Sequence, residues 1–188
     1  MTASASDVAA PPAERIEGPR VVLERVAERH LGELRRVRRE PGVVTWWRPP
    51  AAEWPLDNDA DEVGYAVVRR DDGRVVGYVQ YGEDTDPDYR CGSIDLFLDP
   101  AIHGRGYGRE VVAVVAAYLV DGRGHHRVTI DPAADNAAAI ACYAKVGFTP
   151  VGVMRQYERG ADGTWHDGLL MDLLAPELVR AARPPTPQ

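Results

Sequence analysis

The sequence has little of what marks secreted, membrane-spanning or nucleic-acid-binding proteins. Two cysteines, Cys91 and Cys142, are too few for a disulfide framework and have no zinc-site spacing, so we expect reduced, partly buried thiols and no metal. The longest apolar run, 111–120, is about half of the ~20 residues that a membrane helix requires. Lysine and arginine number 22 against 29 aspartates and glutamates, so we expect neither a nucleic-acid nor a membrane partner.

The two ends of the chain are expected to lie outside the folded part. Residues 1–14 are dominated by Ala, Ser and Pro, and 181–188 are again rich in Pro. We therefore expect disordered tails on both sides of a single domain over 15–180. The first residues contain no basic stretch followed by an apolar one, so no signal peptide is predicted and we expect a cytoplasmic protein.

Apolar periodicity and turn residues divide the chain into alternating strands and helices. Strands are expected at 20–24, 65–70, 74–81, 91–98, 127–130, 151–156 and 169–174, and helices at 26–40, from the glycines near 106 to about 119, and 136–146. Asp71, Asp72 and Gly73 predict a hairpin turn, Asp135 an N-cap, and Gly147 the left-handed end of a helix. This order predicts an α/β (α+β) fold with a mixed central sheet.

A glycine-rich segment, 99–109, carries the strongest chemical signal. It leaves an expected strand, contains Gly104, Gly106 and Gly108, and enters an expected helix. Glycines allow the backbone to approach a ligand closely, and the free N–H groups at a helix start attract anions. Arg105 and Arg109 add positive charge, so a pyrophosphate is the expected ligand, although a plain tight turn would have the same glycines. The Walker and dinucleotide-binding patterns do not match.

The segment resembles the acetyl-CoA loop of the GCN5-related N-acetyltransferases (GNAT), whose pattern is Gln/Arg-x-x-Gly-x-Gly/Ala. The required glycines are present, and His103 stands at the first position. The resemblance implies a mixed, mostly antiparallel central sheet flanked by helices, with acetyl-CoA as cosubstrate. The implied acetyl-CoA contacts are the main chain of Phe97 and Leu98 and the loop residues His103, Gly104, Arg105, Gly106, Tyr107, Gly108 and Arg109.

A second motif follows one expected strand later. Residues 136–148 resemble the family segment Asn-x-x-Ala-x-x-x-Tyr-x-Lys-x-Gly-Phe. By this resemblance Tyr143 is the general acid that protonates the leaving thiolate, a role that a hydroxyl beside the sulfur can perform. A packing aromatic is the alternative. Asn136 would bind the cofactor arm or start the helix, and Lys145 would approach the CoA or remain a solvated charge.

The attacking amine must lose a proton, so the reaction needs a base. Asp95 is the candidate, because it lies among Ile94, Leu96 and Phe97 in the strand expected beside the thioester. A carboxylate in such surroundings is unfavourable unless it has a partner or a function. Strand alternation places it on the face of Ser93 and Phe97. An outward-facing strand charge is the alternative.

The surroundings of Asp95 resemble one branch of the family, the aminoglycoside 6'-N-acetyltransferases. The resemblance lies in 77–80, 85–87, 93–95 and 131–132, and in an early tryptophan pair. It implies an acidic cleft for a polycationic amine, with tryptophan faces for sugar rings and ammonium groups. Plain packing and a solvated acidic loop are the alternatives. The expected substrate-binding residues are Trp46, Trp47, Tyr78, Gln80, Glu83, Asp84, Asp95, Asp131 and Asp167.

Three functional hypotheses follow. The first is acetylation of an aminoglycoside, at the 6'-amine, with Asp95 as base or amine anchor and Tyr143 as acid. The second is acetylation of another small amine, a siderophore lysine or a protein N-terminus. The third is a CoA-binding module without turnover, against which the presence of both Asp95 and Tyr143 argues. The sequence leaves a monomer or a homodimer open.

Overall fold

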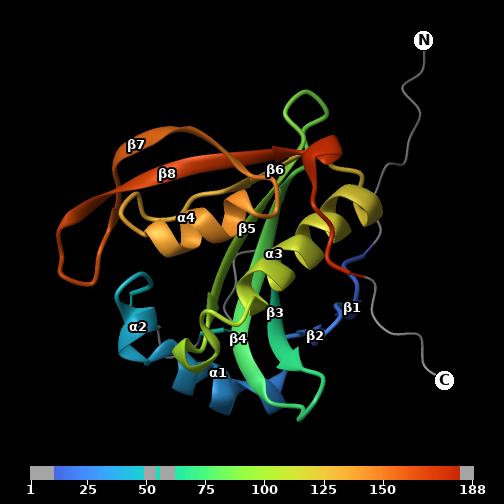
Figure 1. Cartoon of the computed structure of the whole chain (residues 1–188), viewed down its shortest axis with the longest axis vertical. Coiled ribbons are helices and arrows are strands. Elements are labelled where there is room, and N and C mark those ends of the chain that lie inside the picture. The colour runs from blue at the N-terminus through green and yellow to red at the C-terminus, as the bar shows by residue number, and fades with distance from the viewer. Residues whose placement is uncertain (1–10, 49–53, 56–61, 183–188) are drawn as a thin grey trace.

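An eight-stranded mixed sheet forms the centre of this computed structural model, which describes residues 11–48, 54–55 and 62–182. The strands are ordered β1-β2-β3-β4-β5-β6-β8-β7, and every neighbouring pair is antiparallel except β5 and β6. Figure 1 shows the β7–β8 hairpin at the end of the sheet opposite to β1 and β2. The bounds are β1 Arg15–Glu17, β2 Val21–Arg25, β3 Glu62–Arg69, β4 Val75–Asp84, β5 Cys91–Leu98, β6 Arg127–Ile130, β7 Thr149–Arg159 and β8 Trp165–Leu174.

Helices cover both faces of the sheet. The α-helices are α1 Leu31–Arg38, α2 Pro41–Val44, α3 Tyr107–Ala117 and α4 Ala137–Ala144. Three-residue 3-10 turns lie at Glu28–His30, Pro100–Ile102 and Ala175–Glu177, and a π turn over Tyr118–Gly122 continues α3. One face of the sheet packs against α3, and the other packs against α1 and α2.

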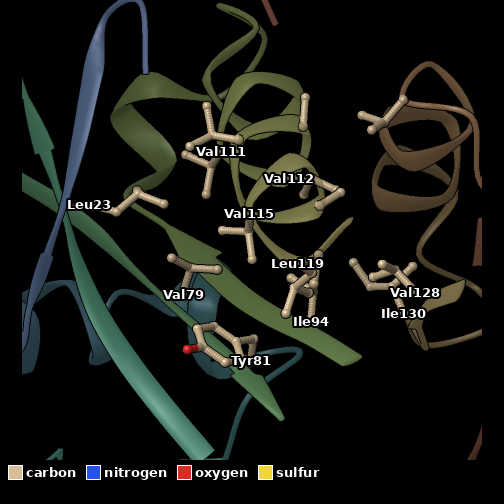
Figure 2. Close-up of a cluster of buried hydrophobic side chains, with 14 of the residues drawn as sticks. Leu23, Val79, Tyr81, Ile94, Val111, Val112, Val115, Leu119, Val128 and Ile130 are labelled. Atoms are coloured by element: carbon tan, nitrogen blue, oxygen red, sulfur yellow. The ribbon is translucent and has the colours of Figure 1, made fainter. Parts of the chain in front are cut away.

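The larger core lies between α3 and the sheet. Figure 2 shows Val111 and Val115 of α3 facing Leu23 and Val79 of the strands. Valine favours strands, yet this segment is a helix, because six successive residues from Val111 to Ala116 are all buried. Tertiary burial therefore overrides local propensity at α3.

The smaller core lies on the opposite face. Leu34 and Val37 of α1 pack there with Tyr78 of β4 and Phe97 of β5. Trp47 lies against this cluster, with ring centroids 5.1 Å from Phe97 and 6.4 Å from Tyr78. The aromatic cluster thus supports the strand that carries Asp95.

A split opens in the sheet between β5 and β6. These parallel strands pair only at Gly92 with Val128 and at Ser93 with Thr129. In the described part of the chain, 94–98 of β5 has no strand partner on that side, because β6 is short and continues its pairing with β8. The split is where a bound molecule can meet a strand edge.

Most expected elements are present, with shifted ends. β1 was not predicted, β7 and β8 are longer than expected, and the helix cap is Asn136 rather than Asp135, because the Asn136 side chain accepts from the Ala139 N–H at 3.1 Å. The expected tails lie mostly outside the described residues. However, Ala13 is bonded to the Tyr65 and Tyr118 hydroxyls at 2.7 and 2.9 Å, so the folded part begins before residue 15. No helix in the described ranges is long and apolar enough to cross a membrane.

Candidate active site

A cleft of about 1240 Å³ runs through the split in the sheet. Its lining includes both the glycine loop and the tryptophans after α2. The cleft brings together most of the residues expected from sequence. Those that line it are Trp46, Trp47, Gln80, Asp95, Phe97, Leu98, His103, Gly104, Gly106, Tyr107, Gly108, Arg109, Asp131, Asn136, Tyr143 and Lys145.

The glycine loop has the geometry of an anion site. Gly104 and Gly106 have φ of 72° and 81°, a left-handed conformation that favours glycine. Gly106 is the N-cap of α3, so the positive end of this helix opens into the cleft. Gly108 lies where α3 meets α4, because a Cβ there would be in van der Waals contact with the Cys142 Sγ at 3.4 Å. The loop therefore fits the pyrophosphate of acetyl-CoA.

The free edge of β5 fits the amide groups of the pantetheine arm. The Asp99 N–H donates to the Val76 carbonyl, so the backbone groups of Asp99 point towards β4. Backbone groups alternate in direction along a strand, so those of Phe97 also point at β4, while those of Leu96 and Leu98 point at the split. The expected main-chain contact at Phe97 therefore does not fit, whereas the backbone groups of Leu96 point at the split. In this structure, the Leu98 carbonyl lies 3.1 Å from His103 Nε2 and the Leu96 N–H donates to Asp95 at 2.9 Å.

Tyr143 projects from the last turn of α4 into the cleft. Its ring lies 6.4 Å from that of Phe148, whose N–H donates to the Tyr143 carbonyl at 3.2 Å as the helix ends. Burial raises the pKa of the Tyr143 hydroxyl well above its usual range, and the charges of Asp95, Cys142 and Asp131 add to the effect. A hydroxyl with such a pKa keeps its proton at neutral pH and is available to donate it.

Asp95 lines the cleft, where its side chain has exposed surface although protein atoms surround its carboxylate on the other sides. Burial raises its pKa well above the usual range, the nearby Asp131 raises it further, and the Leu96 N–H opposes the shift. Glu62 and Glu158 act in the same direction as Asp131. A carboxylate with a raised pKa is a stronger base, which suits proton abstraction from an amine.

Two acidic residues that line the cleft, and a tyrosine that is hydrogen-bonded to a cleft carboxylate, were not predicted. Glu158 of β7 and Glu62 at the start of β3 line the cleft beside Asp95 and Asp131. Burial and the Asp131 charge raise the Glu158 pKa, while His166 and Arg48 oppose the shift. Tyr157 hydrogen-bonds to Asp131, and this bond, followed by burial, raises the Tyr157 pKa to about 12. The spacing of the sequence contains no signal for these residues, because folding alone brings β3 and β7 to the site.

Arg38 was also missed. It lies at the end of α1, is 6% exposed, and lines the cleft with its guanidinium 4.7 Å from the centroid of the Trp47 ring. Burial lowers the Arg38 pKa to about 10, and Asp95 opposes this shift. Its Nε and Nη1 atoms have no hydrogen-bond acceptor among the described residues. Arg38 is thus a positive charge that partly compensates the negative charge of Asp95.

Four predicted substrate residues lie elsewhere. Glu83 accepts from Arg123 at 2.8 Å and lies 2.7 Å from His125 Nε2, so its carboxylate is bound by these two side chains away from the cleft. Asp84 ends β4 and accepts from the Asp86 N–H, and Asp167 accepts from the Gln156 N–H. Tyr78 is buried beneath the cleft and donates to the Gln80 side chain at 2.9 Å. Arg105 of the loop does not line the cleft either.

Comparison with known proteins agrees with this geometry. A model of the acetyltransferase (GNAT) family matches residues 31–148. N-alpha-acetyltransferase RimI of Mycobacterium tuberculosis is 34% identical over 121 residues, covering 62% of this chain and 71% of RimI. Aminoglycoside N(6')-acetyltransferase type 1 of Klebsiella pneumoniae is 25% identical over 154 residues, covering 71% of this chain and 76% of that protein.

A solved structure gives the same fold. Mycobacterium smegmatis RimJ in complex with CoA-disulfide superposes with a TM-score of 0.74 at 21% identity, covering 89% of this chain and 88% of that one. The family match spans the glycine loop, β5 and α4, three of the segments that line the cleft. The chain therefore belongs to the acetyltransferase (GNAT) family and is an acetyl-CoA-dependent N-acetyltransferase.

Proposed function

We propose that this enzyme acetylates a primary amine of a polycationic small molecule, an aminoglycoside, at its 6'-amine. The observation that carries the proposal is the wall of four carboxylates, Glu62, Asp95, Asp131 and Glu158, at the acceptor end of the cleft. Arg38 and Arg48 compensate this charge only in part. Trp46, which lines the cleft and is 37% exposed, offers a ring face for sugar rings and ammonium groups, and the similarity to an aminoglycoside acetyltransferase agrees with this acceptor.

The carboxylates favour a substrate with several ammonium groups because they raise one another's pKa. Asp131 raises the pKa of both Asp95 and Glu158, after the larger effect of burial. An ammonium group placed between such carboxylates relieves their repulsion and gains charge-assisted hydrogen bonds. A substrate with one amine would satisfy only part of this wall.

The proposed mechanism is direct transfer. Asp95 takes a proton from the acceptor ammonium, and the free amine attacks the carbonyl carbon of the thioester. When Asp95 turns to the amine, the Leu96 N–H is released to donate to the carbonyl oxygen. The C–S bond then breaks, and the leaving thiolate takes the proton of the Tyr143 hydroxyl. The acylated nitrogen loses its second proton, which restores the Tyr143 hydroxyl, and Asp95 releases the proton it took to solvent.

Cys142 also lines the cleft and is the alternative nucleophile for a two-step transfer. Burial raises the pKa of its thiol, while Lys145 and Arg109 oppose the shift. A protonated thiol is a poor nucleophile, which supports direct transfer to the amine.

The test is thiol release from acetyl-CoA with kanamycin, beside a close aminoglycoside that bears a 6'-hydroxyl. We expect release with the 6'-amine alone. Release with both would keep an aminoglycoside acceptor but move the acetylated amine, and release with neither would reject aminoglycosides as acceptors.

A protein N-terminus is the second candidate acceptor, and the 34% identity to RimI favours it. Such a substrate brings one ammonium to Asp95, and its first carbonyl oxygen would suit the Arg38 guanidinium. A panel of short peptides that differ in the first residue, run in the same thiol-release assay, separates the two candidates. Turnover of a peptide at a kcat/KM above that of kanamycin would replace the aminoglycoside proposal.

A further inference from the structure

A buried carboxylate ties the N-terminal hairpin to the first turn of α3. Glu110 is 7% exposed and accepts three hydrogen bonds, from the Arg20 N–H at 2.6 Å, the Arg20 Nε at 2.7 Å and the Val21 N–H at 3.1 Å. A buried carboxylate without such donors would be strongly unfavourable. All three donors come from two neighbouring residues at the start of β2, about 90 residues away in sequence.

The same arginine reaches past Glu110 to the glycine loop. Its Nη1 donates to the Arg105 carbonyl at 3.0 Å, and its guanidinium lies 4.3 Å from the centroid of the Tyr107 ring. Arg105 lies between Gly104 and Gly106, both of which have positive φ. One side chain therefore contacts both the helix start and the loop that precedes it, and it does so from outside the cleft, which Arg20 does not line.

This contact fixes the orientation of one peptide group. In a planar trans peptide, the C=O of Arg105 and the N–H of Gly106 point in opposite directions. Arg20 holds the carbonyl on the outer side, so the Gly106 N–H faces the cleft, which Gly106 lines. This peptide joins Arg105 to Gly106, and the glycines on both sides of Arg105 lower the steric cost of rotating it. The Arg20 bond opposes that rotation.

We propose that Arg20, held by Glu110, is a positioning residue that orients the Gly106 N–H toward the pyrophosphate of acetyl-CoA. Arg20 does not bind the substrate itself. It keeps the loop in its binding conformation before the ligand arrives, so that binding does not have to order the peptide group. The proposal rests on acetyl-CoA binding and is independent of the identity of the acceptor amine.

The test is the Kd for CoA of the Arg20→Met variant, measured by titration calorimetry without any acceptor. This variant keeps the backbone N–H bonds to Glu110 and loses the contact to Arg105. We expect a Kd about tenfold higher, which corresponds to about 1.4 kcal/mol. Dephospho-CoA, which has the pyrophosphate but no 3'-phosphate, should lose affinity by the same factor.

Two variants serve as controls. Arg70→Met removes a bond of 2.7 Å to the Gly18 carbonyl of the same hairpin without touching the loop, so CoA affinity should change less than about twofold. Arg20→Lys keeps a cation beside Glu110 and so protects the fold. A single ammonium cannot reproduce the two-sided contact of the guanidinium, so we expect a Kd at least about threefold higher.

Four results would overturn the proposal. Unchanged CoA affinity in Arg20→Met would remove the positioning role, and an equal loss in Arg70→Met would indicate general hairpin stabilisation. Wild-type affinity in Arg20→Lys would mean that charge alone matters. A loss that disappears with dephospho-CoA would mean that Arg20 contacts the 3'-phosphate directly. If Arg20→Met does not fold, as judged by circular dichroism, the Arg20→Lys titration decides.

Discussion

At the residue scale, the proposed mechanism depends on two titratable groups with opposite tasks, Asp95 as the base and Tyr143 as the acid. Burial raises the pKa of both Asp95 and Tyr143. For a carboxylate this means a stronger base, and for a phenol it means a hydroxyl that stays protonated. The two residues also approach from different sides of the sheet, since Asp95 shares the α1 face with Phe97 while Tyr143 packs partly against the α3 core.

Asp95→Asn should lower kcat/KM by about 10²-fold or more, because a base is lost. It should also raise Tm at neutral pH. The folded-state pKa of Asp95 lies above the unfolded value, so its ionisation destabilises the fold as pH rises through that window. The gain in Tm should therefore vanish at acidic pH, where the carboxyl is protonated in both states. Melting curves between pH 3 and pH 8 measure it, and an equal gain at every pH would contradict this account.

Tyr143→Phe should lower kcat by about 10²-fold while the Kd for CoA stays within about twofold, because the hydroxyl acts on the leaving thiolate and the ring keeps its packing on Phe148. Steady-state rates and calorimetric titration give the two numbers. A loss of CoA affinity as large as the loss of turnover would instead assign Tyr143 a binding or packing role.

Cleft residues that belong to a local sequence motif could be predicted from the sequence, whereas residues selected only for their charge could not. The glycines of the loop and Tyr143 have fixed spacing within one segment, so their placement follows from that segment. Glu83 has the same chemistry as Glu158, yet Arg123 and His125 satisfy it, from 40 residues further along the chain. Only tertiary packing decides which of these two carboxylates faces the cleft.

At the element scale, α4 is held at both ends by features visible in the sequence. Asn136 caps its start, and Gly147 ends it with a φ of 115°. The valine-rich α3 and the full length of β7 were harder to predict, because burial and pairing with β8 determine them. Element ends therefore follow from sequence where a cap or glycine marks them, and not where packing sets them.

Gly147→Ala should destabilise the protein by about 3 kcal/mol or more, because positive φ adds strain and the new Cβ would lie 2.3 Å from the Glu177 carbonyl oxygen. Gly73→Ala is the matched control, since its φ is 70° but nothing lies within 4 Å of the Cβ. There the loss should be about 1 kcal/mol. Urea unfolding compares them, and equal losses would show that strain alone limits α4.

At the scale of the whole molecule, the net charge of -7 and the carboxylates of the cleft would both attract the cationic acceptor that we propose. Raising the salt concentration from about 20 to 200 mM should increase the KM for kanamycin several-fold, because exposed charges are screened within about 10 Å at 0.1 M. The KM for an amine of similar size that carries only one ammonium group should change less with salt. Equal salt dependence of the two KM values would argue against an acidic acceptor site.

The two halves of the cleft are built from different parts of the polypeptide. In the proposed arrangement, acetyl-CoA binds to backbone groups of the glycine loop and of the free edge of β5, whereas the acceptor contacts side chains from α1, β3, β5 and β7. A mutation exchanges a side chain but leaves an N–H or C=O in place. Mutations therefore affect the two halves unequally: the acetyl-CoA half keeps its binding groups through most mutations, while the side chains of the acceptor half can change. Selection by a new amine can reshape that half in single steps, without first losing the acetyl donor.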